Sequence, residues 1–107
     1  MARYSKQKFN HDHERLSLLA NAISHPARIE ILSILSEKGS VTCGEIVNLL
    51  PFSQSTVSQH LNELKIAGII KYESIGTKSV YSIDANGIDE YVFRFNTFFK
   101  NLLHLSK

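Results

Sequence analysis

The sequence has little of several residue types, and each shortage narrows what the protein can be. Among its 107 residues there is one cysteine, Cys43, so no disulfide can form within the chain, which fits a reducing compartment. No apolar run approaches the roughly 18 residues of a membrane span. The polar start at residues 1–6 lacks the apolar core of a secretory signal. We therefore expect a cytoplasmic protein without a membrane partner.

Arrangements typical of catalysis are missing as well. The sequence contains no glycine-rich phosphate loop, no usable Cys/His or Ser/His/Asp set, and no two carboxylates expected in one cleft. Ser58 and His60 are close in sequence, but a helix turns them away from each other. We therefore expect a protein that is not an enzyme and that needs no cofactor.

What is present fits one small folded domain. The hydrophobic fraction of 43% is ordinary for a globular protein, and the charged fraction of 21% is too low for a disordered chain. A net charge of +2 points only weakly to nucleic acid. The distribution of the basic residues says more than the net charge, because Arg3, Lys6 and Lys8 all lie in the first ten residues. Residues 1–10 are therefore predicted to form a basic, mobile arm.

Helix-start and helix-stop signals divide the rest of the chain. Pro26 suits the first turn of a helix and Gly39 suits its end. Thr42 and Glu45 match a capping box, and Ser53 can cap the helix that follows Pro51. The predicted elements are helices at 12–23, 26–38, 42–50 and 53–67, strands at 69–74 and 79–83, and a helix at 88–105. This order, mainly helical with a two-stranded hairpin, is typical of a winged helix-turn-helix, with the helix-turn-helix at 42–67 and the wing at 69–83.

The helix expected at 53–67 carries the functional signal. Val57, Leu61 and Leu64 recur at helical spacing and predict one buried face. The opposite face has short, uncharged hydrogen-bonding groups, where a solvated helix usually carries Lys and Glu. Glutamine can bond adenine at two points, and serine can donate to a base or a phosphate. The DNA contacts predicted from this helix are Gln54, Ser55, Thr56, Ser58, Gln59 and Asn62.

The predicted hairpin tip offers a second contact with DNA. Gly76 permits a tight turn, and Lys78 supplies a point charge suited to phosphate. With Thr77 these residues form the predicted wing contact, although a plain solvated turn would look the same. Arg28 has two interpretations that the sequence leaves open, a phosphate contact or an ion pair with Glu30 or Glu14.

Four segments together resemble the ArsR/SmtB family of repressors. They are residues 25–32 (HPARIEIL), 53–61 (SQSTVSQHL), 67–70 (AGII) and 76–83, in the right order and spacing. The resemblance covers roughly residues 12–105. It implies a homodimeric winged helix that covers a promoter until a signal arrives. It also implies that Gln54, Ser55, Ser58 and Gln59 meet the major groove, with 76–78 as the wing.

A homodimer is also expected from the excess of apolar residues on the last helix. That helix has more aromatic residues than a small domain can cover, and the resemblance puts the first and last helices at a two-fold interface. Packing within one chain is the alternative. The predicted interface residues are Leu16, Leu19, Ile23, Tyr91, Phe95, Phe98, Phe99 and Leu102.

The expected signal-sensing sites depart from those of the family. Metal-sensing relatives carry paired cysteines at the start of the third helix, where this chain has Cys43 alone, and the last helix has no histidine before His104. No metal site is therefore predicted, and the inducer stays open. Weaker candidates are metal binding by His11 and His13 with His104, and a redox role for Cys43. A winged-helix module that binds protein rather than DNA is a further alternative.

Overall fold

A computed structural model describes residues 9–105 of the chain. Of the arm expected at 1–10, residues 1–8 lie outside the described part. The described elements are α2 (His11–Ala22), α3 (Pro26–Lys38), β1 (Ser40–Thr42), α4 (Cys43–Leu49), α5 (Gln54–Ile66), β2 (Ile70–Ile75), β3 (Lys78–Ile83) and α6 (Ala85–Leu105). The winged helix-turn-helix order predicted from the sequence is confirmed, with corrections at the sheet and at α6.

Local capping fixes where the two helices of the helix-turn-helix begin. The Glu45 N–H donates to Thr42 Oγ1 at 3.1 Å, and the Thr42 N–H donates to Glu45 Oε1 at 3.0 Å, so the predicted capping box is present. The Thr56 N–H donates to Ser53 Oγ at 3.3 Å at the start of α5. These caps satisfy N–H groups that the first turn of a helix leaves free.

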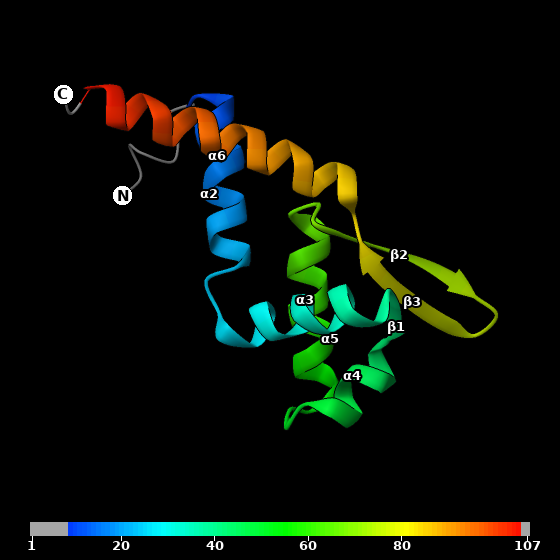
Figure 1. The fold of residues 1–107 in the computed structure, drawn as a ribbon. Coiled ribbons are helices and arrows are strands. Elements are labelled where there is room, and N and C mark those ends of the chain that lie inside the picture. Colours follow the sequence, from blue (N-terminus) through cyan, green and yellow to red (C-terminus); the bar gives the residue numbers. More distant parts are fainter. Residues whose placement is uncertain (1–8, 106–107) are drawn as a thin grey trace.

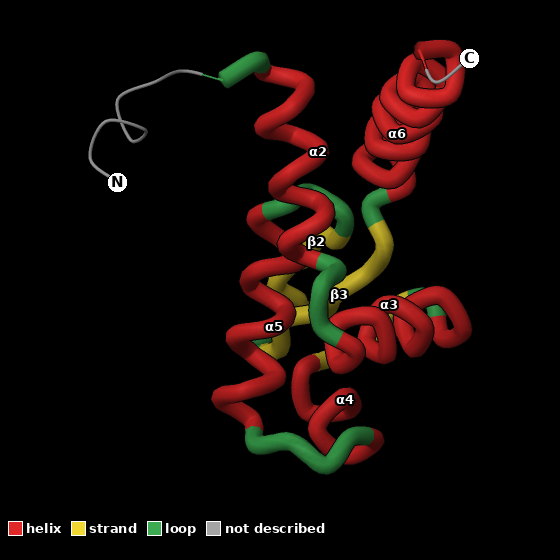
Figure 2. The backbone as a smooth tube through the Cα atoms, turned by 90° about the vertical axis from the view of Figure 1, so that its left-hand side faces the viewer, coloured by secondary structure: helices red, strands yellow, loops and turns green. Residues whose placement is uncertain are grey.

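The helices form two groups at opposite ends of the molecule. Helices α3, α4 and α5 gather at one end, while α6 crosses α2 at the other, and the β2–β3 hairpin projects to one side (Figure 1). Turned by 90°, the backbone shows α4 and the turn into α5 farthest from the end of α6 (Figure 2). The core lies mainly among α3, α4, α5 and the sheet, and includes Ile31, Leu35, Ile46 and Ile69 among its buried residues. The helix-turn-helix and the α2–α6 pair therefore present separate surfaces.

The sheet has three strands where the sequence predicted two. Its order is β1-β3-β2 and both pairings are antiparallel, with Val41 opposite Tyr81. Strand β1 is only three residues long and pairs with β3 residues 38 to 42 positions away, so no local pattern marks it. The predicted strands at 69–74 and 79–83 leave residues 75–78 as the hairpin tip. That tip is too long, since Ile75 pairs with Lys78 and leaves a two-residue turn. Gly76 takes φ 64° in that turn, a region that favours glycine.

Helix α6 begins at Ala85, three residues before the predicted start. The sequence places the start of this helix after Asn86-Gly87, but Asp84 acts as a cap. Its Oδ1 accepts from the Gly87 N–H at 3.1 Å, and its carbonyl accepts from the Ile88 N–H at 3.0 Å. The helix therefore starts one turn earlier than expected.

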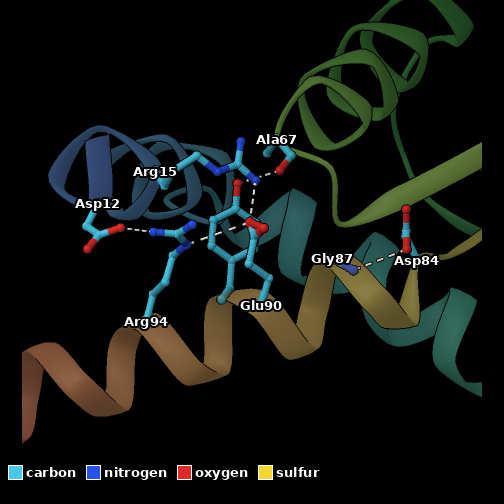
Figure 3. Close-up of polar contacts among 8 residues, drawn as sticks. Asp12, Arg15, Ala67, Asp84, Gly87, Glu90 and Arg94 are labelled. Atoms are coloured by element: carbon cyan, nitrogen blue, oxygen red, sulfur yellow. Dashed lines mark hydrogen bonds and ion pairs between the residues drawn. The ribbon is translucent and has the colours of Figure 1, made fainter. Parts of the chain in front are cut away.

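The start of α6 is fastened to the junction between α5 and β2. The Tyr91 hydroxyl donates to the carbonyl of Ala67, the residue that ends α5. The Asp84 N–H donates to the Ile69 carbonyl at 3.0 Å. Gly87 lies against the same junction. A Cβ added to it would lie 1.8 Å from the Gly68 carbonyl oxygen, so the backbone of α6 is in direct contact with the backbone at Gly68. Figure 3 shows this junction beside α6.

Polar contacts complete the link between α2 and α6. Arg15 Nη2 lies 2.9 Å from Glu90 Oε2, and Arg94 pairs with Asp12 (Figure 3). The Arg15 guanidinium also lies over the Tyr91 ring, 5.0 Å from its centroid. Ion pairs this exposed contribute at most about 1 kcal/mol each, so they orient α2 on α6 more than they stabilise the fold.

Candidate nucleic-acid interface

Helix α5 has one face inside the protein. The side chains of Val57, Leu61 and Leu64 are each 0% exposed, which confirms the predicted buried face. They belong to the core cluster, together with Ala67 at the end of the helix. Because three successive turns are anchored in this way, the opposite face of α5 has a fixed direction.

The exposed face of α5 carries the polar groups expected to read DNA. Five of the six predicted contacts are exposed, namely Gln54, Ser55, Ser58, Gln59 and Asn62. Thr56 is half-buried, and its hydroxyl accepts from Ser53 Oγ at 3.0 Å within the cap. The side chains at the exposed positions are uncharged donors and acceptors, which can form hydrogen bonds with base edges.

The wing tip lies apart from α5 at the end of the hairpin. Gly76, Thr77 and Lys78 are all exposed, as a contact with the DNA backbone needs. Ile75 is 55% exposed beside them and was not singled out from the sequence. An aliphatic side chain at a strand end gives no local signal of exposure, because the alternation of a short hairpin predicts either face.

Comparisons with known proteins relate the chain to transcriptional regulators. The model for "Bacterial regulatory protein, arsR family" matches residues 25–72. An HTH-type transcriptional regulator of Methanocaldococcus jannaschii is 36% identical over 80 residues, which covers 75% of this chain and 90% of that protein. The HTH-type transcriptional regulator YgaV of Escherichia coli is 30% identical over 79 residues, covering 74% and 80% of the two chains. The chain belongs to the arsR family.

The shared fold extends over most of this arsR-family protein. A solved ArsR-like transcriptional regulator from Rhodococcus sp. RHA1 superimposes with a TM-score of 0.73 at 21% sequence identity, over 89% of this chain and 92% of that one. The family model and the Methanocaldococcus jannaschii relative confirm the family resemblance seen in the sequence. The protein is a DNA-binding transcriptional regulator of the winged helix-turn-helix type and not an enzyme.

The surroundings of Arg28 fit neither interpretation that the sequence left open, a phosphate contact or an ion pair with Glu30 or Glu14. It is 8% exposed, so its charge lies inside the protein. It donates to the Asn21 carbonyl at 3.2 Å, to the Ala22 carbonyl at 3.3 Å and to His60 Nδ1 at 3.1 Å. The pairing with His60 joins positions 32 residues apart, which no local spacing reveals.

His60 on α5 and Cys43 on α4 have shifted pKa values. Burial lowers the pKa of His60, and the nearby charges of Arg28 and His25 lower it further. Burial raises the pKa of the Cys43 thiol, which a hydrogen bond with the Gln54 side chain partly offsets. A thiol with a raised pKa is a poor thiolate at neutral pH, which does not favour a redox role for Cys43.

The weak metal candidates of this arsR-family chain lie on the α2–α6 pair. His11 and His13 are exposed at the start of α2, and the His13 ring packs edge-on to Phe98 at 6.3 Å. His104 is exposed near the end of α6. Within residues 9–105 no three His, Cys, Asp or Glu side chains gather as a metal site. No helix in that range is long and apolar enough to span a membrane.

The predicted interface residues divide into covered and exposed groups. Tyr91 is 2% exposed within one chain, so the expectation that it needs a second copy to cover it is wrong. Leu16 and Leu19 are also buried in one chain, by packing between α2 and its neighbours. Ile23 and Phe95 are half-buried against the core. The remaining three stay exposed, namely Phe98, Phe99 and Leu102.

Proposed function

We propose that this arsR-family protein is a repressor that covers operator DNA as a homodimer. The exposed face of α5 enters the major groove, and the wing tip meets the neighbouring backbone. The observation that carries the proposal is the division of α5 into a fully buried aliphatic face and an exposed, uncharged polar face. The free N–H groups at the start of α5 favour a nearby phosphate as well.

The second copy is proposed to pack on the α2–α6 pair. On a helix that turns about 100° per residue, Val92, Phe95 and Phe99 fall on one side, with Leu102 and Leu103 beside them. All but Phe95 are exposed, and Phe99 is 52% exposed. An apolar stripe of this kind marks an interaction surface. A two-fold dimer would place two copies of α5 about one DNA turn apart, which suits a symmetric operator.

Relatives that are named as repressors support the proposal that the protein represses transcription. The arsenical resistance operon repressor of Staphylococcus xylosus is 29% identical over 77 residues, and the repressor PagR of Bacillus anthracis is 32% identical over 66 residues. Because a protein that binds operator DNA works where the chromosome lies, we propose that this one is cytoplasmic.

The experiment that tests the proposal selects genomic fragments bound by the purified protein and then measures variants on the selected operator. Gln54→Ala and Gln59→Ala should each weaken binding by about 1–3 kcal/mol, because a glutamine bonded to a base edge discriminates by about that amount. Circular dichroism should show an unchanged fold, since both side chains are exposed.

A matched control is Asn86→Ala, which removes an exposed amide from the first turn of α6, before the apolar stripe begins, instead of from α5. It should bind the operator like the parent. If both glutamine variants also bind like the parent, or if no fragment is selected, α5 is not the recognition helix.

A further inference from the structure

The guanidinium of Arg28 is buried without an acidic partner. Within residues 9–105 no carboxylate lies within ion-pair distance of it. Its donors go instead to the carbonyls of Asn21 and Ala22, at the end of α2. The last carbonyls of a helix have no partner within the helix and carry partial negative charge. Arg28 therefore takes up the free end of α2, and its Nε remains for a third partner.

That third partner is the imidazole of His60 on α5. Arg28 Nε donates to His60 Nδ1 at 3.1 Å, so Nδ1 must be the unprotonated acceptor and the ring proton sits on Nε2. Burial and the charges of Arg28 and His25 all lower the pKa of His60. At neutral pH the ring is therefore an uncharged acceptor, which is the form that this hydrogen bond requires.

The bond adds a directional contact in the middle of α5, where the neighbouring anchors are apolar. The aliphatic anchors Val57, Leu61 and Leu64 exclude water, but hydrophobic contact has little directional preference. A hydrogen bond weakens steeply when its angle changes. His60 adjoins Gln59 in the sequence, so a rotation of α5 that moves the reading face also breaks the bond to Arg28.

We propose that Arg28 is a positioning residue, which holds the reading face of α5 toward DNA by joining His60 to the end of α2. This rests on the proposed function, in which that face reads an operator. A proton on His60 Nδ1 turns the acceptor into a donor and places two cations in contact. Acid therefore releases α5 from α2 and weakens operator binding.

The direction of the pH effect follows from the groups around the ring. Arg28 on α3 and His25 just before α3 oppose protonation of His60. The Phe52 ring, from the turn before α5, is uncharged and lies 6.4 Å from the imidazole. Glu63 is the only acidic residue of α5 and lies one turn beyond His60. The contribution of neutral His60 is thus complete above its ordinary pKa and is lost as the pH falls through its lowered pKa.

The test measures affinity for the selected operator at about pH 7.5 and about pH 5.5, at constant salt. The parent should lose up to about tenfold in affinity per pH unit below the pKa of His60. His60→Asn keeps an oxygen that can accept from Arg28 but does not titrate. It should bind within about threefold of the parent at the higher pH and lose the acid sensitivity. His25→Asn is the matched control and should stay acid-sensitive.

A second measurement reads the pair without DNA. Nitrogen NMR of the parent should show the Nε2–H tautomer of His60, and Arg28→Gln should raise the pKa of that ring. His60→Asn with the same acid sensitivity as the parent, or His60 protonated on Nδ1 at neutral pH, would overturn the proposal. If the parent selects no DNA, the proposed function fails instead, while the tautomer still decides whether Arg28 and His60 are paired.

Discussion

At Gly87 the backbone of α6 leaves no room for a side chain. A Cβ there would lie 1.8 Å from the Gly68 carbonyl oxygen, and that oxygen belongs to backbone that cannot rotate away. We expect Gly87→Ala to lower the free energy of unfolding by about 1–3 kcal/mol, the usual cost of forcing an added methyl into a packed site. Urea unfolding followed by circular dichroism measures the loss.

Gly44→Ala is the matched control for that substitution. A Cβ on Gly44 meets Thr42 Oγ1 at 3.8 Å, an ordinary contact, and Gly44 lies in α4. Alanine is favoured over glycine in a helix by up to about 1 kcal/mol, so this variant should be as stable as the parent or more so. Equal losses in the two variants would contradict the close approach of α6 to Gly68.

Residues were predictable from the sequence where the cause was local. Val57, Leu61 and Leu64 were identified because burial follows the period of one helix. Arg28 was not, because its partners come from α2 and α5, and a guanidinium on α3 fits a phosphate equally well by its chemistry. Tyr91 looked like an exposed aromatic residue, but the carbonyl of Ala67 gives its hydroxyl a buried partner.

The wing is the element whose contribution should be electrostatic. Lys78 is exposed at the end of β3, and a lysine acts on phosphate as a point charge. Lys78→Gln should weaken binding to specific and non-specific DNA alike. The slope of log affinity against log salt should become shallower by about 0.9, the value for one lost phosphate contact. Filter binding over a range of salt concentrations gives the slope.

Lys100→Gln serves as the control for the wing, because it removes an exposed charge from α6 instead. Its slope should match that of the parent. A wing variant that loses affinity for the operator but keeps the full salt slope would show that Lys78 does not neutralise a phosphate.

Element boundaries followed from the sequence where caps decide them. The Thr42–Glu45 box and the Ser53 cap set the starts of α4 and α5. Helix α6 began earlier than predicted because Asn86-Gly87 has the composition of a turn, whereas Asp84 caps it as the first turn of a helix. Strand β1 was missed because three residues bury too little to show a pattern, and pairing with β3 is what makes them a strand.

For the whole molecule, the prediction concerns its oligomeric state. A carboxylate buried without a partner in an apolar interface is strongly unfavourable, so Phe99→Glu should convert a dimer into a monomer. Phe99 is 52% exposed in a single chain, and the fold of one copy should therefore persist. Analytical ultracentrifugation measures the mass of the assembly. The monomeric variant should also bind the operator more weakly, because each copy then binds only one half-site.

Lys100→Glu reverses a charge one position along the same helix, outside the stripe that contains Phe99, and should leave the mass unchanged. If Phe99→Glu also sediments like the parent, the second copy packs elsewhere.

The architecture itself was predictable, because the order of caps, turns and hairpin specifies a winged helix. The dimer stays a prediction, since one chain reveals an apolar stripe but not what covers it.

The exposed face of α5 contributes none of its five exposed side chains to the core. Selection can therefore rewrite these positions with little effect on folding, since surface substitutions usually change stability by no more than about 0.5 kcal/mol. Descendants of one gene can diverge toward different promoters while the scaffold stays constant. For an engineer, a library randomised at these positions should yield folded proteins at high frequency, and its members should differ mainly in which promoters they silence.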